Sequence, residues 1–384
     1  QHYFSTYLRS NGDAKMINMR SILTYSLAIL GLICFLSVFF ESNNPQIIFS
    51  AILIGMMGFF RINPLFYQKF SFLNDFKLDF CISLLVAFFI IKEISNGFGQ
   101  TLWFLSICAW LHSWLAVEKL MSKENKVFPL VYSFGIPILF GFWLLFFWEV
   151  MTVGLEIPTV ILPPPSMIGI KFIGSLDILF ADFQQTFMKS VLAGYFIGCS
   201  SAFIFAVLID KNDFLRRGLL PVGNFISALP IVGIAPIMVM WFGFDWQSKA
   251  AVVVVMTFFP MLVNTLSGLN SSSLIERDLL NTYAASYWQT LFKLRLPAAM
   301  PFIFNALKIN STLALIGAIV AEFFGTPIVG IGFRISTEVG RMNLDMVWAE
   351  ITVAAIAGSV SYGTLSLIER LVTSWHPSYR LKNN

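Results

Sequence analysis

Few side chains in this 384-residue sequence could carry bond chemistry. The three histidines, His2, His112 and His376, are too scattered to form a metal-ligand cluster. All four cysteines lie inside apolar runs without C-x-x-C spacing, which is typical of buried hydrophobic residues; they are Cys34, Cys81, Cys108 and Cys199. We therefore expect neither a metal site nor a disulfide. The sequence also lacks a nucleophile and base pair and a G-x-x-x-x-G-K-[ST] phosphate loop, so we expect no enzyme activity and no ATP bound by that route.

Polar side chains inside apolar runs are the better candidates for function. Within a membrane such groups are costly unless they face a cavity or one another. The candidates to line a translocation path are Asn224, Ser227, Asn264, Asn310, Ser311, Glu322 and Glu350. Hydrogen bonding between helices is the competing interpretation for each Asn and Ser. Pro230 and Pro236 free backbone carbonyls within one predicted span, which suits either a fixed kink or a gate.

Glu322 is the sharpest of these candidates because it ends a predicted span in the sequence Ala-Glu-Phe-Phe-Gly. We expect it either to pair with Arg334 or Arg341 in the following outer loop, as a structural tie, or to help form an outer gate. A carboxylate at a gate suits a neutral or amine-bearing solute better than an anion.

The elements that position these residues are membrane helices. The chain is 57% hydrophobic and 12% charged and contains 41 Phe, so a polar surface could not cover its apolar side chains in water. About 20 apolar residues cross a bilayer as a helix. Apolar runs predict ten spans, at about 21–40, 46–63, 78–93, 100–118, 129–150, 186–208, 220–241, 250–268, 304–322 and 346–369. The second and third runs are short, so eight spans is the competing count.

The basic residues predict the orientation of these spans. Lys and Arg in short loops favour the cytoplasmic side. With ten spans and a cytoplasmic N-terminus, seventeen basic residues fall in inner loops and five in outer loops. Both chain ends are therefore expected in the cytoplasm. The net charge of +4 does not indicate nucleic acid as a partner.

A break in composition divides the chain into two domains. The sequence EKLMSKENK, residues 118–126, separates them. We expect an N-terminal extension of about four membrane helices over residues 1–120. A second domain of about six helices, over residues 127–378, contains Pro and Gly inside its spans, which is common in membrane helices that kink or pack closely.

The stretch YAASYWQTLFKLRLPAAMP, residues 283–301, lies in the longest predicted inner loop. A helix here places Tyr283, Tyr287, Leu291 and Leu294 on one side. Such a helix suits the membrane surface or the groove of another protein. Leu296 and Pro297 are expected to end the helix and turn the chain into the next span.

This loop resembles the cytoplasmic coupling loop of binding-protein-dependent ABC importer permeases, whose pattern is Glu-Ala-Ala, three residues, Gly, nine residues, Ile, one residue, Leu-Pro. Counting back from Leu296-Pro297, Leu294 takes the Ile position, Ala284 the Gly position and Asp278 the Glu position. Leu279 and Leu280 replace the two alanines. The resemblance implies that the helix around Asp278 to Leu291, with Tyr287 on its apolar side, docks into an ATPase subunit.

Further motifs are similar to the nitrate, sulfonate and taurine branch of this family. They are IPTVILPPPSMIG at 157–169, ALPIVGIAPIMVMWFG at 228–243, FFPMLVNTLSGL at 258–269 and LPAAMPFIFNALKINSTLALIGAIVAEFFG at 296–325. The resemblance covers about 127–378 and implies an all-α, six-helix type I permease core in a bacterial inner membrane. It also implies two copies of the chain, separate ATPase subunits that bind ATP and magnesium, and an external solute-binding protein.

The stretch GTPIVGIGFRISTEVGRMNLDMVWAEI at 325–351 is closer to permeases for pyrimidine-type thiamine precursors or riboflavin than to those for nitrate, sulfonate or taurine, which remain the alternative. A secondary transporter is a rival of another class. It would need an ion site near the midplane and commonly two related halves, and the sequence shows no repeat. A membrane enzyme is the third interpretation, but the sequence offers no group of catalytic residues to support it.

Overall fold

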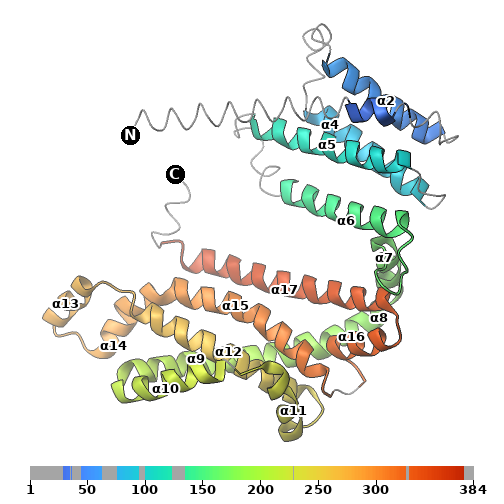
Figure 1. Ribbon diagram of the computed structural model, residues 1–384. Coiled ribbons are helices and arrows are strands. Elements are labelled where there is room, and N and C mark those ends of the chain that lie inside the picture. Colours follow the sequence, from blue (N-terminus) through green and yellow to red (C-terminus); the bar gives the residue numbers. More distant parts are fainter. Residues whose placement is uncertain are drawn as a thin grey trace, which may run out of the picture. The chain divides into compact units, whose positions relative to one another are not determined.

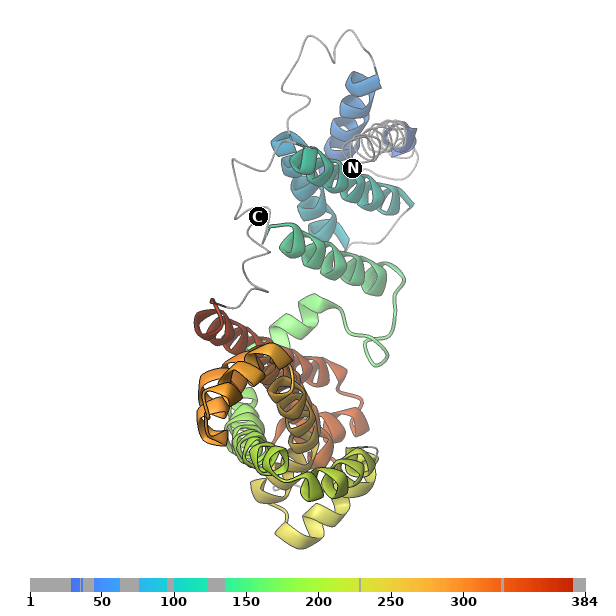
Figure 2. The same cartoon turned by 90° about the vertical axis from the view of Figure 1, so that its left-hand side faces the viewer.

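The computed structural model describes residues 29–34, 36, 45–62, 76–94, 100–122, 135–227, 229–325 and 328–375. These residues form helices joined by turns and short connections (Figures 1 and 2). They divide into two compact units, residues 1–166 and 167–384. The all-α fold predicted from the apolar runs is therefore confirmed.

The first unit contains α2 (Pro45–Ile62), α4 (Phe76–Glu93), α5 (Gln100–Ser122) and α6 (Ile136–Gly154). Their apolar faces form one hydrophobic cluster that also includes Cys34. Polar contacts inside this unit include two that join different helices through α5. The His112 Nδ1 atom is 3.1 Å from Asp79 Oδ1, and Trp143 Nε1 donates to Ser113 Oγ over 2.7 Å.

The second unit continues from α7 (Pro165–Gly174), which begins just before the boundary between the units. Its further helices are α8 (Leu176–Phe183), the π-helical segment η4 (Gln184–Val191), α9 (Leu192–Lys211), α10 (Asp213–Ser227), α11 (Ile231–Phe242), α12 (Trp246–Leu269), α13 (Leu274–Thr282), α14 (Tyr287–Thr290), the π-helical segment η5 (Leu291–Arg295), α15 (Leu296–Glu322), α16 (Ile331–Gly340) and α17 (Leu344–Val372).

Five helices among the described residues are long and apolar enough to cross a membrane: 136–154, 176–211, 246–269, 287–322 and 344–372. Two of them are continuous for 36 residues, roughly 54 Å, so they extend well beyond a hydrocarbon core of about 30 Å. Their ends therefore carry the connecting segments away from the bilayer. The chain is a multi-pass membrane protein.

The other predicted spans differ from expectation. The run 78–93 forms α4, whose charged residues Lys77, Asp79, Lys92 and Glu93 make it a poor membrane helix. The run 46–63 contains only a shorter apolar helix, and α5 is not among the span candidates. The run 21–40 lies largely outside the described residues.

The core of the second unit is built around α12, which packs against both α9 and α15 (Figure 1). Small residues allow the close approach of α9. A Cβ atom added at Gly194 would lie 2.5 Å from Val253 Cβ, and one at Gly198 would clash with the Thr257 hydroxyl. Without an aqueous driving force between membrane helices, this close packing supplies much of the stability.

The predicted span 220–241 is two helices. Pro230 is the residue before α11 and adopts an extended backbone with ψ of 124°. It therefore separates α10 from α11. The sequence had instead predicted one continuous span here, with Pro230 as a kink or a gate within it. Pro236 does lie inside α11.

Candidate functional site

The connection between α12 and α15 contains two short helices instead of the single helix predicted around Asp278 to Leu291. Each helix begins with a capping box, in which a serine and the residue three positions later bind each other's backbone N–H groups. Ser273 and Glu276 form the box of α13, and Ser286 and Gln289 form that of α14. The two serines therefore define two separate helix starts.

The turn between these helices depends on Ala284, which has a φ of +53°. This left-handed conformation is strained for alanine and natural for glycine. Ala284 is also the residue that takes the Gly position in the coupling-loop pattern. The geometry supplies the physical reason for glycine at that position, because the chain must reverse there after α13.

Leu296 and Pro297 do not end a helix. Pro297 lies in the first turn of α15, where η5 runs directly into α15, so the expected turn is wrong. Proline lacks an N–H group and collides with the carbonyl four residues earlier in a regular helix. The π-helical segment immediately before it accommodates this irregularity.

Two of the predicted docking residues face the protein's own core. Leu291 is 2% exposed and belongs to the same hydrophobic cluster as α9, α12 and α15. Tyr287 packs against this cluster, and its hydroxyl donates to Asp210 Oδ2 over 2.9 Å. Leu294 is half-buried. These residues anchor the segment instead of forming its outer face.

The outer face of α13 and of the turn that follows it carries other apolar residues. Leu274, Ile275 and Tyr283 are 75%, 82% and 77% exposed. Leu279, at 57%, lies one helical turn after Ile275, and the exposed Asp278 lies one turn after Leu274. We call Leu274, Ile275, Leu279 and Tyr283 the α13 face. It lies at one end of the bundle of α9, α12, α15 and α17 (Figure 1).

In the same region, the last turn of α9 is joined to the end of η5, immediately before α15. Arg295 donates from both terminal nitrogens to the Asp210 carboxylate, over 2.6 and 2.7 Å. The Arg295 Nε atom also donates to the carbonyl of Leu269, at the end of α12, over 3.0 Å. Both charged side chains are largely buried.

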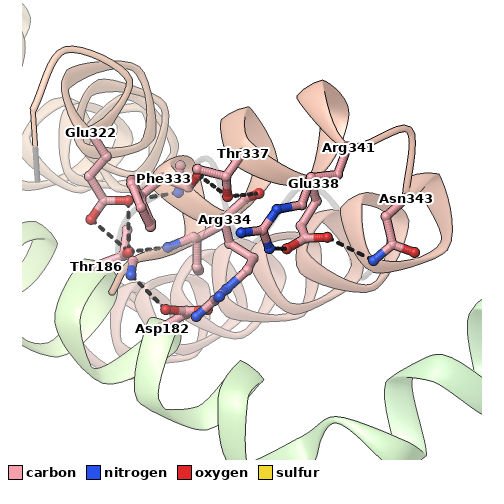
Figure 3. Close-up of polar contacts among 12 residues, drawn as sticks. Asp182, Thr186, Glu322, Phe333, Arg334, Thr337, Glu338, Arg341 and Asn343 are labelled. Atoms are coloured by element: carbon pink, nitrogen blue, oxygen red, sulfur yellow. Dashed lines mark hydrogen bonds and ion pairs between the residues drawn. The ribbon is translucent and has the colours of Figure 1, made fainter. Parts of the chain in front are cut away.

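At the opposite end of the bundle, three side chains from other helices bind the N-terminus of α16 (Figure 3). Asp182 Oδ1 accepts from Gly330 N over 2.6 Å, and Thr186 Oγ1 accepts from Ile331 N over 2.8 Å. Glu322 Oε2 accepts from Gly332 N over 2.7 Å. These groups satisfy N–H donors that a helix leaves free, and the two carboxylates complement its dipole.

The partners expected for Glu322 are therefore wrong. Its other hydrogen bond comes from the Thr186 hydroxyl, over 2.8 Å. Arg334 Nε pairs with Asp182 Oδ2 over 2.8 Å, and Arg341 pairs with Glu338 in its own helix over 2.9 Å (Figure 3). Glu322 is still a structural tie, but through the backbone of α16.

Glu350 of α17 is fully buried beside this group. Neither of its carboxylate oxygens has a hydrogen-bond partner among the described residues. Arg334 lies close enough to act on it electrostatically, and the Asp182 carboxylate lies within reach of a hydrogen bond when one of the two acids is protonated. A buried carboxylate without donors is costly in its charged form, so Glu350 is the least stabilised acid of the cluster.

Three of the path candidates make internal contacts. Asn310 Nδ2 donates to the Thr257 carbonyl of α12 over 2.8 Å, which is the interhelical bond considered as the alternative. Asn264 donates to Pro260 O and Ser311 to Lys308 O, each within its own helix. The side chains of Asn224 and Ser227 lie outside what the structure describes.

A cavity of about 170 Å³ lies among α11, α12 and α15. It is lined by Leu229, Ile231, Ile234, Val252, Val255, Met256, Pro260 and Leu313. None of these lining residues is charged. Pro230 and Pro236 flank or interrupt α11, the helix on one side of this cavity.

Reasoning from the sequence missed Asp210, Asp182 and Thr186. Asp210 and Asp182 were detectable as acids inside or at the edge of long apolar runs, which usually need a partner. Thr186 gave no such signal. Its role depends on residues 136 and 145 positions away in the sequence.

Comparison with known proteins places these features in a family. Residues 190–375 match the family model "Binding-protein-dependent transport system inner membrane component". The formylaminopyrimidine transport permease protein ThiX of Halalkalibacterium halodurans is 29% identical over 243 residues, covering 62% of this chain and 95% of ThiX.

Two further relatives show the same coverage. The riboflavin transport system permease protein RibX of Chloroflexus aurantiacus is 28% identical over 251 residues, covering 64% of this chain and 91% of RibX. The taurine transport system permease protein TauC of Escherichia coli is 26% identical over 271 residues, covering 67% and 96%. These relatives are permeases and not enzymes. Residues 190–375 thus form a domain of the binding-protein-dependent transport system inner membrane components, the kind of ABC transporter permease that the coupling-loop motif indicated.

Proposed function

We propose that the chain is the membrane path of an ATP-driven importer that passes a small solute from an external binding protein into the cytoplasm. Two copies of the chain, in contact with membrane lipid, work with two ATPase subunits, which bind ATP and magnesium. The end of the bundle that carries α13 faces the cytoplasm. Both chain termini also lie on the cytoplasmic side. The end that carries α16 faces the binding protein.

The observation that carries this proposal is the α13 face. Four large apolar side chains are exposed on a nine-residue helix and the turn that follows it. Both short helices of the α13–α14 segment have N-terminal caps, and Tyr287 and Leu291 pack the segment against the bundle. An apolar helix face held rigidly at the end of a bundle suits the groove of a soluble partner. A partner ATPase supplies that groove.

Purification of the chain with its ATPase in lipid nanodiscs tests this role. Leu274→Glu and Ile275→Glu are expected to release the ATPase, because each places a charge in an apolar contact. Ser336→Glu introduces the same charge at an exposed site at the opposite end and is expected to have no effect on binding. Retention of the ATPase by both α13 variants would refute the docking role.

For the solute, we propose an uncharged heteroaromatic compound such as a pyrimidine thiamine precursor or a flavin. The cavity among α11, α12 and α15 is lined by apolar side chains without a cation to attract a sulfonate or nitrate. The names of ThiX and RibX agree with this class, whereas TauC represents the anionic or zwitterionic alternative.

Stimulation of ATP hydrolysis distinguishes the two classes. The chain, its ATPase and its cognate binding protein are reconstituted and supplied in turn with formylaminopyrimidine, riboflavin and taurine. We expect one of the first two to raise the hydrolysis rate. Stimulation by taurine alone would instead favour the sulfonate and taurine class.

A further inference from the structure

Asp210 is an acidic side chain in the contacts that hold the α13–α14 segment to the bundle. It lies in the last turn of α9, and its side chain is 4% exposed. Arg295 binds both of its oxygens, and the Tyr287 hydroxyl donates to the oxygen that Arg295 Nη1 also binds. A two-pronged arginine–carboxylate pair fixes orientation as well as distance.

The same contacts include the end of α12. The Leu269 carbonyl accepts from Arg295 Nε over 3.0 Å and from Arg277 Nη2 over 3.1 Å. Arg277 belongs to α13 and also donates to Ser272 Oγ over 2.7 Å. The C-terminal ends of α9 and α12, the end of η5 and α13 itself therefore meet in one set of charged hydrogen bonds. Two arginines here also complement the negative ends of the helix dipoles.

These contacts leave little freedom for the segment to move alone. Breaking the pair would leave a largely buried charge without its partner, which is strongly unfavourable. The aromatic ring of Trp288, 5.7 Å from Lys211 Nζ, adds a second contact between α14 and the end of α9.

We infer that Asp210 is a positioning residue, which transmits movement of the α13 face to α9, α12 and α15 as one body. This inference rests on the proposed function, because it assumes that a partner moves α13. It assigns to Asp210 a role in coupling that is separate from binding the partner, since Asp210 belongs to α9 and its side chain is largely buried.

The test uses the complete complex of chain, ATPase and binding protein in nanodiscs. Asp210→Asn keeps the size of the side chain and an acceptor for Tyr287 but removes the charge that holds Arg295. We expect the ATPase to bind with unchanged affinity and its basal rate to persist. Stimulation by the binding protein is expected to fall by about 5- to 150-fold, the usual range for coupling between two sites. Asp177→Asn, the same change at an exposed position of α8, is the matched control.

Two further variants separate coupling from folding. Arg295→Lys keeps the charge but loses the two-pronged geometry and is expected to lower stimulation in the same direction. The double variant Asp210→Arg with Arg295→Asp restores an ion pair in reverse and is expected to recover stimulation. Full stimulation of ATP hydrolysis in both Asp210→Asn and Arg295→Lys would overturn the inference. So would a double variant whose stimulation is as low as that of Asp210→Asn. Assembly of the unmodified chain with its ATPase reports separately on the proposed function.

Discussion

Ala284 shows how a single backbone angle links a motif to a fold. Its φ of +53° places a methyl group where only glycine is comfortable. We predict that Ala284→Gly raises the thermal stability of the chain in detergent, by up to about 1 kcal/mol after the greater flexibility of glycine is included. Ala285→Gly is the control, because Ala285 does not have a positive φ, and it should lower stability. Equal shifts in the melting temperature for Ala284→Gly and Ala285→Gly would show that the backbone at Ala284 is not strained.

The buried acids at the α16 end make a second prediction at this scale. Asp182 accepts from Gly330 and Arg334, whereas Glu350 has no hydrogen-bond partner in the described part of the chain. Asp182→Asn should therefore destabilise the protein by about 1–3 kcal/mol, because it leaves Arg334 without its partner. Glu350→Gln should leave the melting temperature unchanged or raise it. A larger loss in Glu350→Gln than in Asp182→Asn would contradict this order.

At the scale of elements, the N-terminus of α12 depends on one carboxylate. Asp245 accepts from Trp246 N over 2.8 Å and from Gln185 Nε2 over 2.9 Å. The backbone N–H of Trp246, followed by Gln185, lowers the pKa of Asp245 below its usual value. The cap therefore stabilises the helix above the ordinary Asp pKa and is lost as the pH falls through the lowered value.

Hydrogen exchange measures this loss directly. Amide exchange in the first turn of α12 should accelerate, relative to other helix starts, when the pH falls through this lowered pKa. Asp245→Asn should remove the pH dependence, because its side chain does not titrate. A first turn that shows the same pH dependence in both forms would mean that Asp245 does not hold the cap.

The same scale shows what could be predicted from the sequence. Composition and run length correctly predicted an all-α membrane protein. The spacing from Leu296-Pro297 placed Ala284 at the Gly position of the motif, but periodicity predicted one helix through it, and the turn there was missed. Helix boundaries were less accurate. Tyr287 and Leu291 share one face by periodicity, but which face is inward depends on Asp210 and Arg295, which meet only in the folded chain. The partners of Glu322 were missed for the same reason, because they come from distant helices.

At the scale of the whole molecule, the chain extends beyond the region that aligns with its relatives. ThiX and RibX match over 95% and 91% of their own lengths but cover only 62% and 64% of this chain. The family match at 190–375 lies entirely in the second unit. More than a third of this chain therefore lies outside each of these two alignments.

We predict that a chain beginning at residue 127 still assembles with its ATPase and responds to the binding protein. It retains α6 and every helix of the second unit, including the α13 face and the contacts of Asp210. A chain beginning at residue 167 also loses α6, one of the five helices suited to cross the membrane, and is expected to fail in assembly. Size-exclusion chromatography with ATPase assays compares both with the full chain. If the chain beginning at residue 167 binds the ATPase while the chain beginning at residue 127 does not, the domain boundary is misplaced. If both lose binding, residues 1–126 are themselves needed by the transporter.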